Sequence, residues 1–415
     1  MSANAEIITI GDEILYGQTL DTNSHWISGE LDQLGIKVIR KTTVRDLEEH
    51  ILTAFEEAEN RVDIILITGG LGPTNDDLTK PTLAKYFGVE MEMNKAALEE
   101  ITTRYEQAGW ELNKLNKSQA IQPKGSVKVT NELGTAPGIW FEKNDTIFIS
   151  MPGVPFEMKG MMEKEVLPKL KQKFITEKIY HKIIRTGGIP ESKLAEKLED
   201  WEKNLPDHIK LAYLPTLAQV KLRLTAKGTD QKQLEKDVAD QLDFCLPIID
   251  KYVYSTNNIE LEERVGQLLR ESGKTISCAE SCTGGYLSHL ITSVPGSSDY
   301  FQGSYVAYSY DIKEKALQVD KKVLETQGAV SEEVVIQMAE NIRKVFGTTI
   351  GVSLSGIAGP GGATEDKPVG TVWIAYSDGI KTEAKKFIFA KDRKLNIKLS
   401  AIVALNIVRS NLMGE

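Results

Sequence analysis

The sequence predicts an α/β protein built from three domains. Its 415 residues exceed what one small module needs, because a domain usually takes roughly 100 to 200 residues. Short apolar stretches typical of strands alternate with helical stretches from the start of the chain. Glycine-rich turns follow several of these strands directly, as expected where a parallel sheet binds a ligand.

The first domain is predicted over residues 1–174. Strands are expected at 6–10, 37–44, 63–68 and 146–150, and helices at 22–34, 47–59 and 156–171. The run Ile64-Ile65-Leu66-Ile67 is apolar on both faces, which is typical of a central strand covered by helices on either side. The βαβαβ order therefore predicts a parallel sheet whose ligands bind at the carboxyl ends of the strands.

The second and third domains are predicted over residues 175–256 and 257–415. The second is a small α+β unit, with strands at 181–185, 209–213 and 219–226, helices at 191–203 and 231–244, and turns at Pro215 and Gly228. The third begins with an amphipathic helix at 261–270 and ends with another helix at 393–411.

Composition excludes several classes of protein. Lys and Arg number 50 against 59 Asp and Glu, a net charge of -9, so nucleic acid is not an expected partner. No apolar run approaches the roughly 18 residues of a membrane span, so we expect a cytoplasmic protein without a membrane partner. Three cysteines without a C-x-x-C pattern indicate reduced thiols, and five scattered histidines leave acid–base chemistry to other side chains.

A glycine-rich loop follows the buried strand of the first domain. It includes Gly69, Gly70, Gly72 and Thr74 and ends at Asp76 and Asp77. Glycines let the backbone amides approach an anion, and paired carboxylates suit a divalent metal, so the loop predicts a metal–phosphate site. The alternative is an ordinary turn with an aspartate cap on the next helix.

A second polar turn, residues 275–285, follows an apolar strand of the third domain. Ser281 is a candidate nucleophile there, because the hydroxyl is at an exposed turn and amides of the following helix can stabilise an oxyanion. The alternatives are that Ser281 only caps the helix, or that the neighbouring Cys282 is the nucleophile. Tyr308 and Lys313 span a strand-to-helix junction and could remove the serine proton without a histidine.

The motifs of the first domain resemble those of the competence/damage-inducible protein A (CinA) family. They are Ile10-Gly11-Asp12-Glu13-Ile14-Leu15, Asp21-Thr22-Asn23, the run 69–77, Gly134-Thr135-Ala136-Pro137-Gly138, and Pro152-Gly153-Val154-Pro155 with Glu157. The resemblance implies a doubly wound, molybdopterin-binding-like domain that hydrolyses ADP-ribose with a divalent metal of unknown identity. By position, the loop residues Gly69, Gly70, Gly72 and Thr74 would contact phosphate, and Asp76 and Asp77 would hold the metal. The resemblance further implies a pocket lined by Asp12, Asn23, Gly134, Thr135 and Glu157, although each could instead be a turn residue or cap.

In the same family the middle domain is KH-like. A KH module that binds RNA needs a Gly-x-x-Gly clamp with basic neighbours, whereas this chain has Gly187-Gly188-Ile189-Pro190 followed by an acidic residue. We therefore expect a structural or dimerisation role for this domain.

The third domain resembles the C-terminal CinA domain, whose free-standing relatives are nicotinamide mononucleotide deamidases. The resemblance implies that Ser281 attacks the carboxamide, that Tyr308 and Lys313 handle the proton, and that no cofactor is needed. Substrate contacts would come from residues 282–285 (Cys282, Thr283, Gly284, Gly285) and from the second glycine-rich strand end (Gly356, Gly359, Gly361, Gly362). Either loop could hold the substrate phosphate.

The expected function is thus a two-activity enzyme of pyridine nucleotide salvage, acting on nicotinamide mononucleotide and ADP-ribose as a homodimer. One alternative keeps the fold but makes the first domain a nucleotide-binding or molybdopterin-binding module without turnover. Another is an interaction protein of competence or DNA repair, without activity on either substrate.

Overall fold

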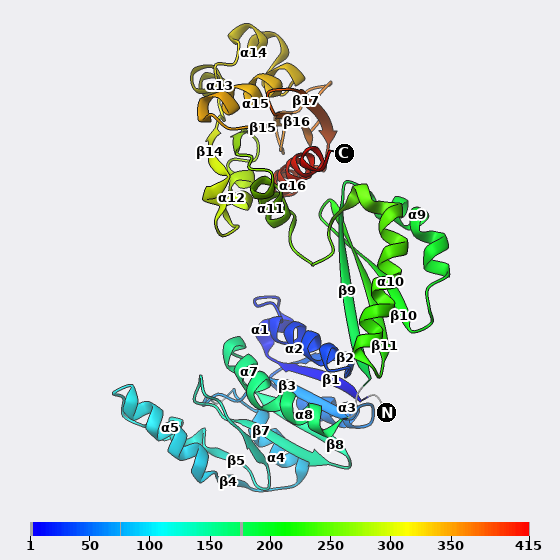
Figure 1. The fold of residues 1–415 in the computed structure, drawn as a ribbon. Coiled ribbons are helices and arrows are strands. Elements are labelled where there is room, and N and C mark those ends of the chain that lie inside the picture. Colours follow the sequence, from blue (N-terminus) through cyan, green and yellow to red (C-terminus); the bar gives the residue numbers. More distant parts are fainter. Residues whose placement is uncertain (1–2, 75, 175–176, 415) are drawn as a thin grey trace. The chain divides into compact units, whose positions relative to one another are not determined.

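The computed structural model describes residues 3–74, 76–174 and 177–414 (Figure 1). The chain divides into two compact units, Met1–Tyr180 with Lys227–Leu234, and His181–Ala226 with Glu235–Glu415. The expected boundary at 174/175 falls at residues 175–176, which lie outside the described residues. No helix within the described ranges is long and apolar enough to cross a membrane.

The first unit contains a six-stranded sheet in the order β2-β1-β3-β8-β7-β6. These strands are β1 (Asn4–Ile10), β2 (Lys37–Val44), β3 (Ile64–Thr68), β6 (Val127–Val129), β7 (Gly138–Lys143) and β8 (Thr146–Met151). The strands β2, β1, β3 and β8 are parallel, and β7 and β6 add an antiparallel edge. As predicted, the wholly buried strand β3 is central, between β1 and β8.

Helices cover both faces of this sheet (Figure 1). One face carries α2 (Thr22–Gln33) and the continuous stretch α7 (Pro155–Met161), η1 (Met162–Val166) and α8 (Leu167–Lys173), and the other carries α3 (Glu48–Glu59) and α4 (Thr79–Phe87). Ile7 of β1 belongs to the first core and Ile8 to the second, because successive side chains of a strand point to opposite faces. The domain is therefore doubly wound.

Smaller elements complete the first domain. They are α1 (Asp12–Leu15), β4 (Met91–Met93), α5 (Lys95–Gln107), α6 (Lys114–Ser118) and β5 (Ile121–Pro123). The strands β4 and β5 pair antiparallel as a separate two-stranded sheet.

The middle domain is a four-stranded sheet in the order β10-β11-β9-β12. Its elements are β9 (Lys178–Gly187), α9 (Glu191–Lys203), β10 (Ile209–Thr216), β11 (Gln219–Gly228), α10 (Gln231–Ile249), η2 (Asp250–Tyr252) and β12 (Val253–Ser255). Gly228 was predicted in a turn but is the last residue of β11. Pro215 was also predicted in a turn, and this was wrong: it lies within β10, opposite Val220. The strand tolerates it because β10 is an edge strand, where a missing N–H removes no bond that the sheet needs.

The third domain has a five-stranded sheet in the order β14-β13-β15-β16-β17, with β14, β13 and β15 parallel. The strands are β13 (Ile276–Glu280), β14 (Phe301–Val306), β15 (Ile350–Gly356), β16 (Thr371–Ser377) and β17 (Thr382–Ile388). One face packs against α11 (Leu261–Glu271), α12 (Tyr286–Thr292) and α16 (Arg393–Met413), and the other against α15 (Glu332–Phe346). The short helices η3 (Ser297–Asp299), α13 (Tyr310–Leu317) and α14 (Lys321–Gln327) connect the strands.

Candidate functional site

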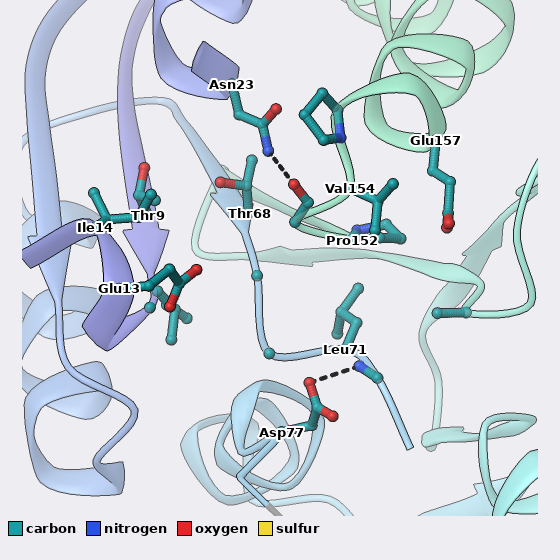
Figure 2. A pocket seen from close by; sticks show the side chains of 18 of the residues that line it. Thr9, Glu13, Ile14, Asn23, Thr68, Leu71, Asp77, Pro152, Val154 and Glu157 are labelled. Atoms are coloured by element: carbon teal, nitrogen blue, oxygen red, sulfur yellow. Dashed lines mark hydrogen bonds between the residues drawn. The ribbon is translucent and has the colours of Figure 1, made fainter. Parts of the chain in front are cut away.

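A cavity of about 520 Å³ lies at the carboxyl ends of β1, β3 and β8 in the first domain (Figure 2). This is the edge at which a doubly wound sheet binds its ligands. The cavity wall includes eight of the predicted residues: Asn23, Gly69, Gly70, Gly72, Asp76, Asp77, Thr135 and Glu157. Three predicted residues, Asp12, Thr74 and Gly134, are not among its lining residues.

Two glycines of the loop after β3 cannot be replaced without moving the backbone. Gly69 and Gly70 have φ values of +105° and +65°. A Cβ on Gly69 would lie 2.1 Å from the Ile10 carbonyl oxygen, and one on Gly70 would lie 2.2 Å from Oγ1 of Thr79. The close approach of this loop to the end of β1 at Gly69, and to the start of α4 at Gly70, thus requires glycine at both positions.

The Asp77 carboxylate holds the loop together. Its Oδ1 accepts the amide of Gly72 at 2.8 Å (Figure 2), and its Oδ2 accepts the amide of Thr74 at 2.9 Å together with the Thr74 hydroxyl. These two amides are therefore already bonded and do not face an anion. The structure gives the amides of Gly70 and Leu71 no acceptor among the described residues, so these two remain for a phosphate.

Asp12 and Gly134 have structural roles beside the cavity. Asp12 pairs with Arg45 at 3.0 Å, and the Arg45 hydrogen bond lowers the pKa of the Asp12 carboxyl. A Cβ on Gly134 would lie 1.9 Å from Oε2 of Glu157, so the glycine makes room for that carboxylate. The same Glu157 oxygen accepts the Asn131 amide at 2.7 Å.

Carboxylates that we did not predict also line the cavity: Glu13, Asp21 and Asp46. Asp46 is half-buried, and burial raises the pKa of its carboxyl, with further increases from the nearby charges of Glu13, Asp12 and Asp76. Glu13 and Asp21 lie in the segment between β1 and α2, and Asp46 lies between β2 and α3. The sequence contained the signal in that each polar turn follows a strand of one parallel sheet.

In the third domain, Ser281 and Lys313 meet directly. Ser281 follows β13 immediately, and its amide donates to the Leu354 carbonyl at the end of β15. Lys313 is on α13, and its Nζ lies 3.0 Å from Oγ of Ser281 and 2.6 Å from the Ala307 carbonyl oxygen. The turn was expected to be exposed, and this was wrong: Ser281 is buried, and the Lys313 side chain is fully enclosed.

Burial changes the charge state available to Lys313. Removal from water disfavours the ammonium form, and it lowers the pKa of Lys313 from 10.5 to about 8. No acidic side chain among the described residues forms an ion pair with it. The Lys313 amine can therefore be neutral in a useful fraction of molecules and can accept the Ser281 proton.

The Tyr308 hydroxyl bonds to Arg393 and not to Ser281. The Tyr308 side chain is exposed, and its hydroxyl accepts a hydrogen bond from Arg393 at 3.0 Å. Lys313 contacts this residue only through the Tyr308 backbone carbonyl, at 3.4 Å. Arg393 also donates to the Gly359 carbonyl at 2.8 Å, so its guanidinium links the tyrosine to the second glycine-rich loop.

Glu280, just before Ser281, occupies the N-terminus of α12. Its fully buried carboxylate accepts the amides of Gly285, Leu287 and Ser288 at 2.8 to 3.1 Å. It also accepts the hydroxyls of Thr283 and Ser288. The expectation that these helix amides face an oxyanion or phosphate was wrong for Gly285, because an internal carboxylate already uses the positive end of the helix.

The three cysteines are buried and reduced. Cys282 belongs to the hydrophobic core of the third domain, and burial raises the pKa of its thiol to about 12. Burial likewise raises the pKa of Cys278. A thiol with so high a pKa supplies almost no thiolate at neutral pH, so the structure favours Ser281 over Cys282 as nucleophile.

The remaining predicted residues lie in the turn after β13 and at or after the end of β15. Thr283, Gly284 and Gly285 make the turn into α12, and Gly284 and Gly285 have φ values of +61° and +100°. Gly356 ends β15 and lies against Val372, whereas Gly361 and Gly362 are exposed in the loop that follows. Asn396 of α16 holds this loop by donating to the Ala358 carbonyl at 3.0 Å.

Sequence reasoning missed Glu280 and Arg393. Glu280 was detectable, because an acidic residue between a strand and a glycine-rich helix start can satisfy the free amides. Arg393 was not, because it is 85 residues away from Tyr308 in the chain.

The chain matches three domain families, and two of them cover its N-terminal and C-terminal parts. Residues 6–172 match a probable molybdopterin binding domain, and residues 258–412 match the CinA C-terminal domain. Residues 181–255 match the KH domain of damage-inducible protein CinA.

The chain also resembles complete proteins along its whole length. It is 52% identical to a CinA-like protein of Cytophaga hutchinsonii over 408 residues, 98% of each chain. It is 41% identical to a CinA-like protein of Flavobacterium psychrophilum, over 99% of this chain and 98% of that one. A solved structure of protein CinA from Thermoplasma acidophilum is 35% identical and covers 41% of this chain and 98% of its own, with a TM-score of 0.38. The chain belongs to the CinA family.

Proposed function

We propose that the third domain hydrolyses the carboxamide of nicotinamide mononucleotide to give nicotinate mononucleotide and ammonia. The observation that carries this proposal is the buried pair of Ser281 and Lys313, with Oγ and Nζ 3.0 Å apart. A serine next to a neutral amine is a complete nucleophile–base pair without an imidazole. Its position at the carboxyl end of a parallel strand suits a small-molecule substrate.

The reaction proceeds through an acyl-enzyme. Neutral Lys313 takes the Ser281 proton as Oγ attacks the carboxamide carbon, and the Lys313 ammonium then protonates the leaving nitrogen, which departs as ammonia. A water molecule then attacks the ester with Lys313 again as base, and the ester C–O bond breaks to release nicotinate mononucleotide while the Lys313 ammonium returns the proton to Ser281 Oγ. The amides of Cys282 and Thr283 have no acceptor among the described residues and can stabilise the tetrahedral oxyanion.

The single phosphate of the substrate would bind between Arg393 and the loop Gly359–Gly362. Glu280 already uses the N-terminus of α12, which disfavours the turn 283–285 as the phosphate site. Arg393 supplies a cation that is held by its bonds to Gly359 and Tyr308. A direct role of Tyr308 in proton transfer stays a prediction.

A product assay tests this proposal. The full-length protein is incubated with nicotinamide mononucleotide, and ammonia and nicotinate mononucleotide are measured together. Equal amounts of both products support the proposal. Cleavage to free nicotinamide, or no product at all, contradicts it.

We further propose that the first domain hydrolyses ADP-ribose to AMP and ribose 5-phosphate with a divalent metal. The residues of the cavity wall support the proposal of a metal, because they include carboxylates but no lysine or arginine among the described residues. Carboxylate oxygens such as those of Asp46 and Asp76 are the hard ligands that Mg²⁺ and Mn²⁺ prefer. Among the described residues no three His, Cys, Asp or Glu side chains form a group that could hold the ion, so substrate phosphate and water would supply its other ligands. When bound, the metal would polarise the diphosphate and make phosphorus more open to attack. Asp77 would keep the phosphate loop in shape, and the amides of Gly70 and Leu71 would orient the phosphate.

The alternative for this domain is binding without turnover. Incubation with ADP-ribose and divalent metals distinguishes the two: AMP release indicates an enzyme, whereas saturable binding without product indicates a sensor. Inactivity of the protein on both substrates would favour the interaction role. A homodimer remains our expectation from the family, and light scattering of the purified protein tests it.

A further inference from the structure

Another cavity, of about 270 Å³, is formed jointly by the middle and third domains within one compact unit. The middle domain contributes the end of β9 with the turn after it, and the turn between β10 and β11. The third domain contributes the start of α11 together with parts of β17 and α16. Among the described residues, none that was assigned to the Ser281 site or to the first-domain cavity lines it. The cavity is therefore separate from both proposed active sites.

Large apolar side chains form part of the cavity wall. They are Leu261, Phe387, Ile402, Val403 and Ile407. Leu261 and Ile407 belong to the hydrophobic core of the third domain, and the other three pack against that core. A ligand with an apolar body is favoured here, because contact with these side chains removes that body from water.

Two side-chain amides in the same wall are oriented by hydrogen bonds inside the protein. Oδ1 of Asn406 accepts the Nε–H of Arg409 at 3.0 Å. Oε1 of Gln219 accepts the Tyr254 hydroxyl, also at 3.0 Å. These bonds fix which end of each amide is the oxygen, and neither NH₂ group has an acceptor among the described residues. The wall therefore offers two amide donors to a ligand.

Lys385 adds a positive charge to this wall. It lies on β17, its side chain is exposed, and it forms no ion pair within the described ranges. No aspartate or glutamate is among the described residues that line the cavity. An ammonium group and two amide donors favour an anion, because hydrogen bonds to a charged acceptor are stronger than neutral ones.

The glycine pair at the end of β9 makes room for one of these donors. Gly188 has a φ value of +77°, and a Cβ there would lie 2.8 Å from Nδ2 of Asn406. A Cβ on Gly187 would lie 2.9 Å from Oδ1 of the same amide. A side chain at either position would displace the Asn406 amide from the place in which Arg409 holds it.

We propose that this cavity binds a small amphipathic anion, a monocarboxylate with an apolar body. The carboxylate accepts hydrogen bonds from Lys385, Asn406 and Gln219, and the apolar body packs on Phe387 and the other large apolar side chains of the wall. A cavity of about 150 Å³ holds benzene, so about 270 Å³ suits a ligand of roughly ten non-hydrogen atoms. The middle domain thus takes part in ligand binding, beyond the structural or dimerisation role expected from the sequence.

Three probes with the same apolar chain and different head groups test this proposal. Octanoate, 1-octanol and octylammonium are each titrated into the full-length protein, and binding is measured by isothermal titration calorimetry. We expect octanoate to bind at least about tenfold more tightly than either of the other two, because only its head group is an anion. Octanoate that fails to bind at millimolar concentration, or that binds no more tightly than 1-octanol, overturns the proposal.

Two variants locate the carboxylate. Lys385→Gln removes the positive charge, and Asn406→Asp keeps the oxygen that Arg409 bonds but replaces the donor by a carboxylate. Each should weaken octanoate binding by about tenfold or more. Lys386→Gln is the matched control and should bind octanoate as the unchanged protein does, because Lys386 is the next residue of β17, is exposed, and does not line the cavity.

Thermal unfolding verifies the fold of each variant. Because Lys385 is exposed, its variant tests the site even where Asn406→Asp fails to fold. Unchanged octanoate affinity in Lys385→Gln overturns the proposal. Equal losses in Lys385→Gln and Lys386→Gln also overturn it, since octanoate would then respond to the charge of the whole surface and not to this cavity.

Discussion

The pKa of Lys313 sets the pH dependence that we expect for deamidation. At pH 7, a lysine with a pKa of 10.5 is neutral in about 0.03% of molecules, whereas one with a pKa of about 8 is neutral in about 10%. Burial thus increases the neutral amine about 300-fold at this pH. Because the neutral Lys313 amine is the base, we expect the deamidase activity to rise as the pH rises.

The assay is the pH profile of kcat/KM for ammonia release, which reports the ionisation of the free enzyme. We expect about a tenfold increase per pH unit below 8 and a plateau above it. Lys313→Arg, which stays protonated, should lose about 10²- to 10⁴-fold in rate. Lys315→Arg is the matched control, because Lys315 is exposed on the same helix and pairs only with Asp311 within the described residues.

Two results would refute this reasoning. One is a flat profile between pH 6 and 9 with chemistry shown to be rate-limiting. The other is a Lys313→Arg variant that retains most of its activity. Either result would mean that the base is another group or that the serine needs none.

The remaining predictions concern the residues around this pair. Ser281→Ala should abolish ammonia release and Cys282→Ala should leave most of it, since the buried thiol has a pKa of about 12; the reverse would make the cysteine the nucleophile. Glu280→Ala should destabilise the domain by roughly 3 kcal/mol or more, because it leaves several buried donors unpaired. The thermal unfolding of this variant is compared with that of Glu325→Ala, an exposed change on α14, and equal transitions would contradict the role of Glu280. Arg393→Gln should raise KM for nicotinamide mononucleotide by about tenfold or more but not for nicotinamide riboside, which has no phosphate; equal losses for both would remove Arg393 from the phosphate site.

Local sequence pattern was enough for most elements of the fold. The apolar run 64–67 predicted a central strand, and β3 lies at the centre of its sheet with every residue buried. Such patterns are readable because strand and helix periodicities are properties of neighbouring residues. Pro215 is an exception, because whether a proline suits a strand depends on which edge of the sheet the strand occupies.

In the candidate sites, too, some features could be predicted from the sequence and others depended on the tertiary structure. The sequence by itself determined that polar, glycine-rich turns follow apolar strands, and hence that Ser281 and the 69–77 loop come directly after strands of a parallel sheet. Only the tertiary structure decided which groups are free to act. Lys313 reaches Ser281 across 32 residues, Arg393 reaches Tyr308 across 85, and the carboxylates of Glu280 and Asp77 are used inside the protein. The physical reason is that hydrogen-bond partners and desolvation depend on what packing brings close, and distance along the chain does not encode it.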